Sequence, residues 1–195
     1  MKTILLLALL ASFTASAQTV APVFPIDATT GHVTFEGVVP TEGINKADLY
    51  SHARTWFAKT FASADAVLQL EDATAGKLIG KGFTDIHVST GYYSPVRTKL
   101  WFTMQVEVKD GRYRYEITDL AFGYYPGTQV TKIVGYNPAI KVPADEALTT
   151  TKGEAVKKGG EVRQAWASTR QETAQTVAGL AQSLQTQMAT ATKEW

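Results

Sequence analysis

The chain of 195 residues contains no cysteine. This absence excludes disulfide bonds, zinc or iron–sulfur sites held by cysteine, a thiol nucleophile and a lipid anchor on cysteine. The fold must therefore be held together by core packing. A hydrophobic content of 45% is ordinary for a globular protein and sufficient for such a core.

A surplus of charge of one sign is also lacking, because 19 Lys and Arg face 18 Asp and Glu. Loss of residues 1–17, which we predict below, removes Lys2 and no acid, and leaves equal numbers of basic and acidic side chains. Nucleic acids and anionic membrane surfaces attract proteins that carry a basic surplus. We therefore predict no nucleic-acid partner and no binding to anionic membranes.

Long hydrophobic runs are missing as well. The apolar stretch from Ile4 to Ala11 is far shorter than the roughly 18 residues that cross a bilayer, and no later stretch reaches that length either. Lys2 before this stretch and Ala15-Ser16-Ala17 after it are typical of a secretory signal that is cleaved before Gln18. We predict a signal peptide over 1–17, export to the periplasm or the medium, and no transmembrane segment in the mature chain.

Residues 18–125 read as one α+β domain that begins with a strand over Gly31–Val39, in which Val33 and Phe35 alternate with polar residues. Further strands are predicted over 66–70 and 77–88. In the latter strand, Gly80 and Gly82 indicate a bulge or a close backbone approach.

A helix is predicted to begin at Asn45, whose side chain can accept from amides of the first turn, and to end near Phe61. Its apolar residues recur at helical spacing and define one buried face. These residues are Leu49, Ala53, Trp56, Phe57 and Thr60.

Asp110-Gly111 favours a two-residue type I′ turn between strands over 100–109 and 112–122. This turn places Met104 opposite Ile117 on a core face. On the other, solvated face we expect an ion pair between Glu107 and Arg114. The same face is predicted to carry Trp101, Thr103, Gln105 and Glu116.

The rest of the chain changes composition. Residues 126–160 read as a linker or long loop with one possible strand at 129–134. Residues 161–195 predict an amphipathic helix, because their larger side chains recur with an 11-residue period. Its first half is expected to pack on the domain. For its second half, from Leu180, three alternatives remain open: contact with a partner, contact with a second copy, or fraying.

Four segments carry a family resemblance: Gly31–Phe35, Lys46–Tyr50 with Trp56, Ile79–Gly82 and Lys109–Tyr115. In this order they resemble a family of exported proteins from Bacteroidetes-type bacteria, domain of unknown function 4468, whose fold is like that of the TATA-binding protein (TBP). The likeness covers roughly 25–125. It implies a curved antiparallel sheet with helices on one face, export, and no assigned activity. It does not imply DNA binding, because fold does not carry function.

Residues suited to catalysis do not converge in the sequence. Asp85 and His87 share one face of a predicted strand and would form a metal site only if His32 joined them from a neighbouring strand. The alternative interpretation is a polar strand face near a sheet edge. We predict no cofactor and no catalytic residue, and keep a metal-binding protein or hydrolase that uses these three residues as a rival hypothesis.

Aromatic residues suggest a binding surface instead. Trp101 on the solvated face, Tyr92 and Tyr93 in a loop, and Arg114 form the candidate recognition patch, since aromatic and arginine side chains anchor interfaces. Structural packing of the same rings is the alternative. We predict a non-catalytic binding or assembly module of the bacterial cell envelope. Its partner is another envelope protein, or a second copy that associates through helix 161–195.

Overall fold

The computed structural model describes residues 21–61, 67–89, 94–125, 141–150 and 160–190. The predicted signal over 1–17, Tyr92, Tyr93 and the possible strand at 129–134 lie outside these residues. The elements in chain order are β1 (Phe35–Pro40), α1 (Lys46–Thr60), β2 (Leu68–Asp72), β3 (Lys77–Val88), β4 (Val96–Lys109), β5 (Arg112–Tyr124), β6 (Val142–Pro143), α4 (Asp145–Thr149) and α5 (Gly160–Met188).

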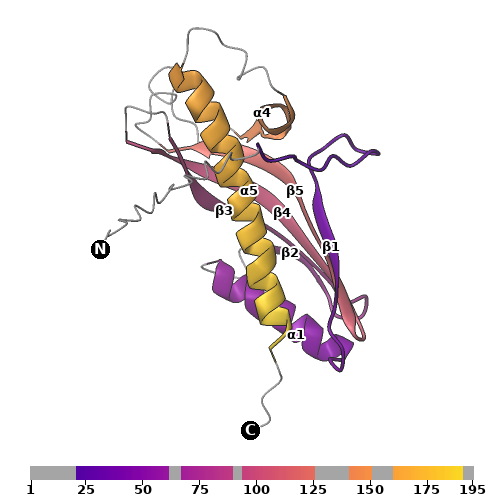
Figure 1. Ribbon diagram of the computed structural model, residues 1–195. Helices are drawn as coiled ribbons and strands as arrows, with labels where there is room; N and C mark the ends of the chain where they lie inside the picture. Colours follow the sequence, from indigo (N-terminus) through magenta and orange to yellow (C-terminus); the bar gives the residue numbers. More distant parts are fainter. Residues whose placement is uncertain (1–20, 62–66, 90–93, 126–140, 151–159, 191–195) are drawn as a thin grey trace, which may run out of the picture.

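The strands form one antiparallel sheet in the order β1-β5-β4-β3-β2, and β6 pairs with β5 beyond the end of β1. The sheet is curved, and α1 and α5 lie on the same face of it (Figure 1). The expected α+β fold, with a curved antiparallel sheet, helices on one face and a long C-terminal helix, is confirmed.

The central hairpin of β4 and β5 has the register that the Asp110-Gly111 turn predicts, with Met104 opposite Ile117 and Glu107 opposite Arg114. Gly111 has a φ of 72°, which a glycine adopts without a Cβ clash, but Asp110 does not have a positive φ. The predicted type I′ turn is therefore wrong, because that type needs a positive φ at both central residues. The core face is buried as expected. Its buried members include Met104, Val106, Val108, Tyr113 and Ile117.

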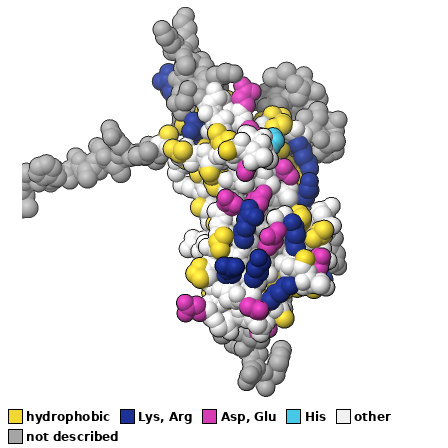
Figure 2. Space-filling model, turned by 90° about the vertical axis from the view of Figure 1, so that its right-hand side faces the viewer, with side chains coloured by type: hydrophobic (Ala, Val, Ile, Leu, Met, Phe, Trp, Pro, Cys, Tyr) yellow, Lys and Arg dark blue, Asp and Glu magenta, His cyan; other side chains and the backbone are white. Residues whose placement is uncertain are grey.

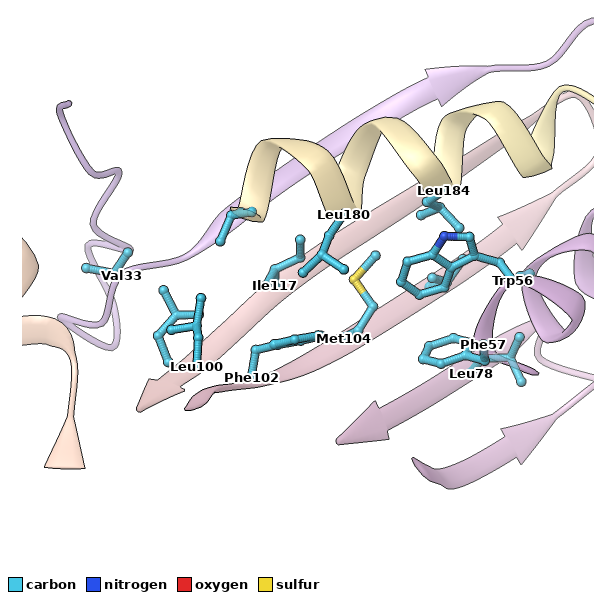
Figure 3. Packing of buried hydrophobic residues seen from close by; sticks show 14 of the residues in the cluster. Val33, Trp56, Phe57, Leu78, Leu100, Phe102, Met104, Ile117, Leu180 and Leu184 are labelled. Carbon is cyan, nitrogen blue, oxygen red and sulfur yellow. The ribbon is translucent and has the colours of Figure 1, made fainter. Parts of the chain in front are cut away.

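Helix α1 is capped as predicted, because the Asn45 side chain accepts a 2.9 Å hydrogen bond from the Asp48 amide. Its buried residues are Leu49, Ala53, Trp56 and Phe57. They pack against β3 and β4, together with side chains of α5 (Figure 3).

Gly80 and Gly82 leave space for the aromatic rings at the end of α1. A Cβ at Gly80 would lie 2.6 Å from a carbon of Phe57, and a Cβ at Gly82 equally close to Phe61. The close approach is thus made by side-chain rings and not by a backbone, and the irregularity in pairing lies in β2, where register with β3 shifts between Leu68 and Leu70. The glycines let α1 approach the sheet closely.

Helix α5 crosses the same face, and its second half, over the described residues 180–190, is not a projecting arm. Val177, Leu180, Leu184 and Met188 are all buried in the core. Figure 3 shows Leu180 and Leu184 directed toward the side chains of the sheet and of α1. The apolar stripe that suggested contact with a partner or a second copy is therefore used within the chain. Among the described residues, no helix is long and apolar enough to cross a membrane.

The segment assigned to a linker also contributes to the core where it is described. Residues 141–150 contain β6 and the short helix α4, and Ala144 and Leu148 are fully buried. Asp145 at the start of α4 accepts a 2.8 Å hydrogen bond from the Val33 amide. This contact ties α4 to the segment that precedes β1.

Candidate functional site

The sheet has a second face, the open face, which is turned away from α1 and α5. Strand alternation and register place on it Glu36 and Val38 of β1; Lys77, Lys81, Phe83, Asp85 and His87 of β3; Arg97, Lys99, Trp101, Thr103, Gln105, Glu107 and Lys109 of β4; and Arg112, Arg114 and Glu116 of β5. The predicted solvated residues, Trp101 and Arg114 among them, therefore do share one face. Basic and acidic side chains alternate over the side of the molecule drawn in Figure 2, without a broad area of one sign.

Arg114 lies within a set of ion pairs toward the hairpin end of this face. Its guanidinium donates to Glu36 at 2.8 Å and to Glu116 at 3.2 Å. The hydrogen bond to Glu36 raises the pKa of Arg114 above its usual value. Glu107 instead pairs with Lys77 at 3.2 Å. The expected cross-strand pair of Glu107 and Arg114 is thus wrong, because both residues find opposite charges on the strands to either side.

At the other end, three rings and two lysines form what we call the aromatic–lysine cluster: Phe83, Trp101, Tyr125, Lys99 and Lys141. The rings of Phe83 and Trp101 have centroids 4.7 Å apart. The Nζ of Lys99 lies 4.5 Å from the Phe83 centroid, 4.7 Å from that of Tyr125 and 6.0 Å from that of Trp101. Lys99 is therefore held by cation–π contacts among three rings.

Lys141, which follows β5 in the chain and directly precedes β6, also belongs to this cluster. Pairing of β6 with β5, with Pro143 opposite Ala121, places Lys141 so that its Nζ lies 3.7 Å from the Trp101 centroid. Gly123 makes room for the indole, because a Cβ there would lie 2.8 Å from Trp101 Nε1. The sequence did not indicate Lys141, which lies in the predicted linker, or Lys99, although the alternation that places Trp101 on this face extends to Lys99.

Asp85 borders the cluster, and both of its carboxylate oxygens accept hydrogen bonds. Its Oδ2 accepts from Arg97 at 2.5 and 2.9 Å, and its Oδ1 accepts from the Tyr125 hydroxyl at 2.7 Å. Partial burial alone would raise the pKa of Asp85, but the hydrogen bonds from Arg97 and Tyr125 outweigh it and lower the pKa. The carboxylate therefore stays ionised and holds Arg97 and Tyr125 in place.

The hypothetical metal site is not assembled. His32 lies 3.0 Å from Asp145, at the start of α4, while Asp85 bonds to Arg97 and Tyr125. His87 extends from an exposed position of β3. In the part of the chain that the structure describes, no group of three or more His, Asp or Glu side chains is arranged to hold a metal ion.

The fold and this face define an α+β protein whose sheet has one helix-covered face and one open face. Residues 35–123 match the family described as "domain of unknown function (DUF4468) with TBP-like fold", so the resemblance expected from the sequence is confirmed over this stretch.

Two solved structures are similar in fold. A DUF4468 family protein from Bacteroides ovatus is 21% identical with a TM-score of 0.63, over 88% of this chain and 93% of its own. A TBP-like protein from Parabacteroides distasonis is 15% identical with a TM-score of 0.54, over 83% of this chain and 96% of its own. Both likenesses extend well beyond 35–123. No curated protein matches this chain in sequence.

Proposed function

We propose that the protein is an exported, non-catalytic binding module of the bacterial cell envelope and that it contacts its partner through the open face. The observation that carries this proposal is the presence of large apolar side chains on a sheet face that α1 and α5 leave uncovered. Phe83 is 38% exposed and Val38 is 65% exposed. Aromatic side chains on an accessible face are the residues that most often anchor protein interfaces.

The bonding of Asp85 supports binding over catalysis. A general acid or base needs a proton site that a substrate can reach. Both oxygens of Asp85 are instead occupied by donors from the protein itself, Arg97 and Tyr125. Its lowered pKa is thus explained by a structural role.

Export is the part of the proposal that rests on the sequence alone. Lys2, the apolar stretch after it and Ala15-Ser16-Ala17 support a cleaved signal. Fractionation of cells that produce the full chain, with N-terminal sequencing of the product, tests this part. We expect a periplasmic or secreted protein that begins at Gln18. An uncleaved protein in the cytoplasm would refute it.

Site-specific photo-cross-linking in the producing cell tests the binding face. A photoreactive amino acid is placed at Val38 or at Phe83 on the open face, and at Gln182 as the control. Gln182 is exposed on α5, on the helical side of the molecule. We expect a discrete cross-linked product from Val38 and Phe83 and none from Gln182. Absence of a product from both open-face positions contradicts the proposed function.

A further inference from the structure

We infer that the aromatic–lysine cluster binds a single carboxylate of a protein partner, an Asp or Glu side chain or a chain terminus that has apolar groups beside it. The inference rests on the proposed function, since it specifies what the open face recognises. It starts from Lys99 and Lys141, whose ammonium groups both lie over the indole of Trp101, at 6.0 and 3.7 Å from its centroid.

These two lysines differ from four other cations of the open face. Lys77, Lys81, Arg97 and Arg114 each have a carboxylate within salt-bridge distance. For Lys99 and Lys141, the structure shows ring contacts and, among the described residues, no ion pair. The nearby acids Asp85 and Asp119 are committed to other donors, namely Arg97, Tyr125, Thr103 and Lys81. The cluster is therefore a local site of uncompensated positive charge.

The rings hold the ammonium groups of Lys99 and Lys141 in place for binding a ligand. A cation–π contact fixes an ammonium group without an anionic partner, so the N–H donors that point away from the ring can still bind a carboxylate. Two ammonium groups over one indole can donate together to the two oxygens of a carboxylate. The exposed part of Phe83 offers an apolar surface to the groups beside that carboxylate.

The surrounding charges favour a single acid over a polyanion. Glu36, Glu107 and Glu116 lie on the same face, and each is paired with a cation of the chain itself. A polyanionic glycan or a nucleic acid requires a continuous basic surface, and these carboxylates would repel it. An isolated positive site with aromatic walls fits one acidic side chain within a largely neutral protein surface.

NMR of the full mature protein tests the site with phenylacetate as the probe, because it joins one carboxylate to an apolar ring. The readout is the indole Nε1–H signal of Trp101, assigned by its absence in W101F. We expect a saturable shift with phenylacetate and none with the neutral phenylacetamide. In K99Q/K141Q, affinity for phenylacetate should fall at least about tenfold, since bonds to charged donors are lost. The charge-retaining K99R/K141R should keep most of it.

The matched control is K109Q/R112Q, which removes two exposed cations at the hairpin end of the same face, away from the rings. It should bind phenylacetate like the unchanged protein. An equal shift with phenylacetamide, or equal binding by K99Q/K141Q, overturns the inference. Tighter binding of a polyanionic glycan such as heparin, competing with phenylacetate, overturns it in favour of a polyanion site.

The cross-linking experiment separates this inference from the proposed function. In K99Q/K141Q we expect the product formed from Val38 and Phe83 to be lost, and in K109Q/R112Q to persist. If the product persists unchanged in K99Q/K141Q, the carboxylate site is refuted while the binding face stands. If no product forms in the unchanged protein, the proposed function itself fails.

Discussion

The indole Nε1 of Trp56 donates a 2.9 Å hydrogen bond to the hydroxyl of Ser183, which lies 127 residues further along the chain. This bond joins α1, inside the region that matches the family, to α5, outside it. Trp56 is almost fully buried, and Leu184, next to Ser183, is fully buried. The long helix is thus part of the domain core rather than an appendage.

Truncation after Gly179 is expected to destabilise the fold instead of altering its oligomeric state. It removes Leu180, Leu184 and Met188 from the core. Loss of buried side chains of this size costs about 2–5 kcal/mol each. Urea unfolding of L184A checks the estimate, with the exposed Q182A as the control, which should change stability by less than about 0.5 kcal/mol. A truncated protein with an unchanged urea midpoint and a changed sedimentation would favour a helix that serves self-association.

The Trp56–Ser183 hydrogen bond should be measurable as a coupling free energy between substitutions of the two residues. S183A leaves a buried indole N–H without its partner, and W56F removes the donor. A double-mutant cycle of these two changes is expected to give a coupling free energy of about 1 kcal/mol. Additive effects of the two changes would mean that the bond contributes nothing to stability.

Replacing Gly80, beneath α1, and Gly179, in α5, by alanine should change the stability of the fold in opposite directions. G80A places a Cβ 2.6 Å from the Phe57 ring and should lower the free energy of unfolding by about 1–3 kcal/mol. G179A, in α5, meets no atom within 4 Å and should raise it by about 1 kcal/mol through helix propensity. Thermal and urea unfolding of both variants check the signs. A neutral G80A would show that α1 can shift away from the sheet at no cost.

His32 and Asp145 predict a pH dependence. The hydrogen bond and the charge of Asp145 raise the pKa of His32 above 6.5. Because the folded pKa lies above the unfolded value, the protonated pair stabilises the fold fully below about pH 6.5, and this contribution disappears as the pH rises through the folded pKa. An NMR titration of the His32 ring measures the midpoint. D145N keeps an oxygen for the Val33 amide but should return the midpoint toward 6.5. An identical midpoint in both proteins contradicts the assignment.

Local signals account for the parts of the fold that the sequence predicts. A two-residue turn at Asp110-Gly111 leaves only one register for β4 and β5. Asn45 and the helical spacing of Leu49, Ala53 and Trp56 define both the start of α1 and its buried face. These features depend on neighbours within a few residues and can be deduced without the rest of the chain.

The candidate site depends on distant parts of the chain, and of the residues in the aromatic–lysine cluster only Trp101 was predicted. Alternation places Trp101 on the open face. No local pattern indicates that Lys141 lies over its ring, because β6 has two residues and pairs through the sheet. Likewise, the stripe on α5 shows which side is apolar but does not indicate that Trp56 and the sheet cover it. Arg114 pairs with Glu36 of β1 and with Glu116 of its own strand. The register of β4 and β5 alone does not show which of the nearby carboxylates Arg114 will bind.

The position of Lys141 on the open face depends on the two residues of β6. Lys141 enters the cluster only because Val142 and Pro143 pair with Phe122 and Ala121. A change in the length of the chain between 125 and 141 can withdraw or replace this lysine while β3, β4 and β5 remain as they are. The charge of this end of the open face can therefore change without any repacking of the core.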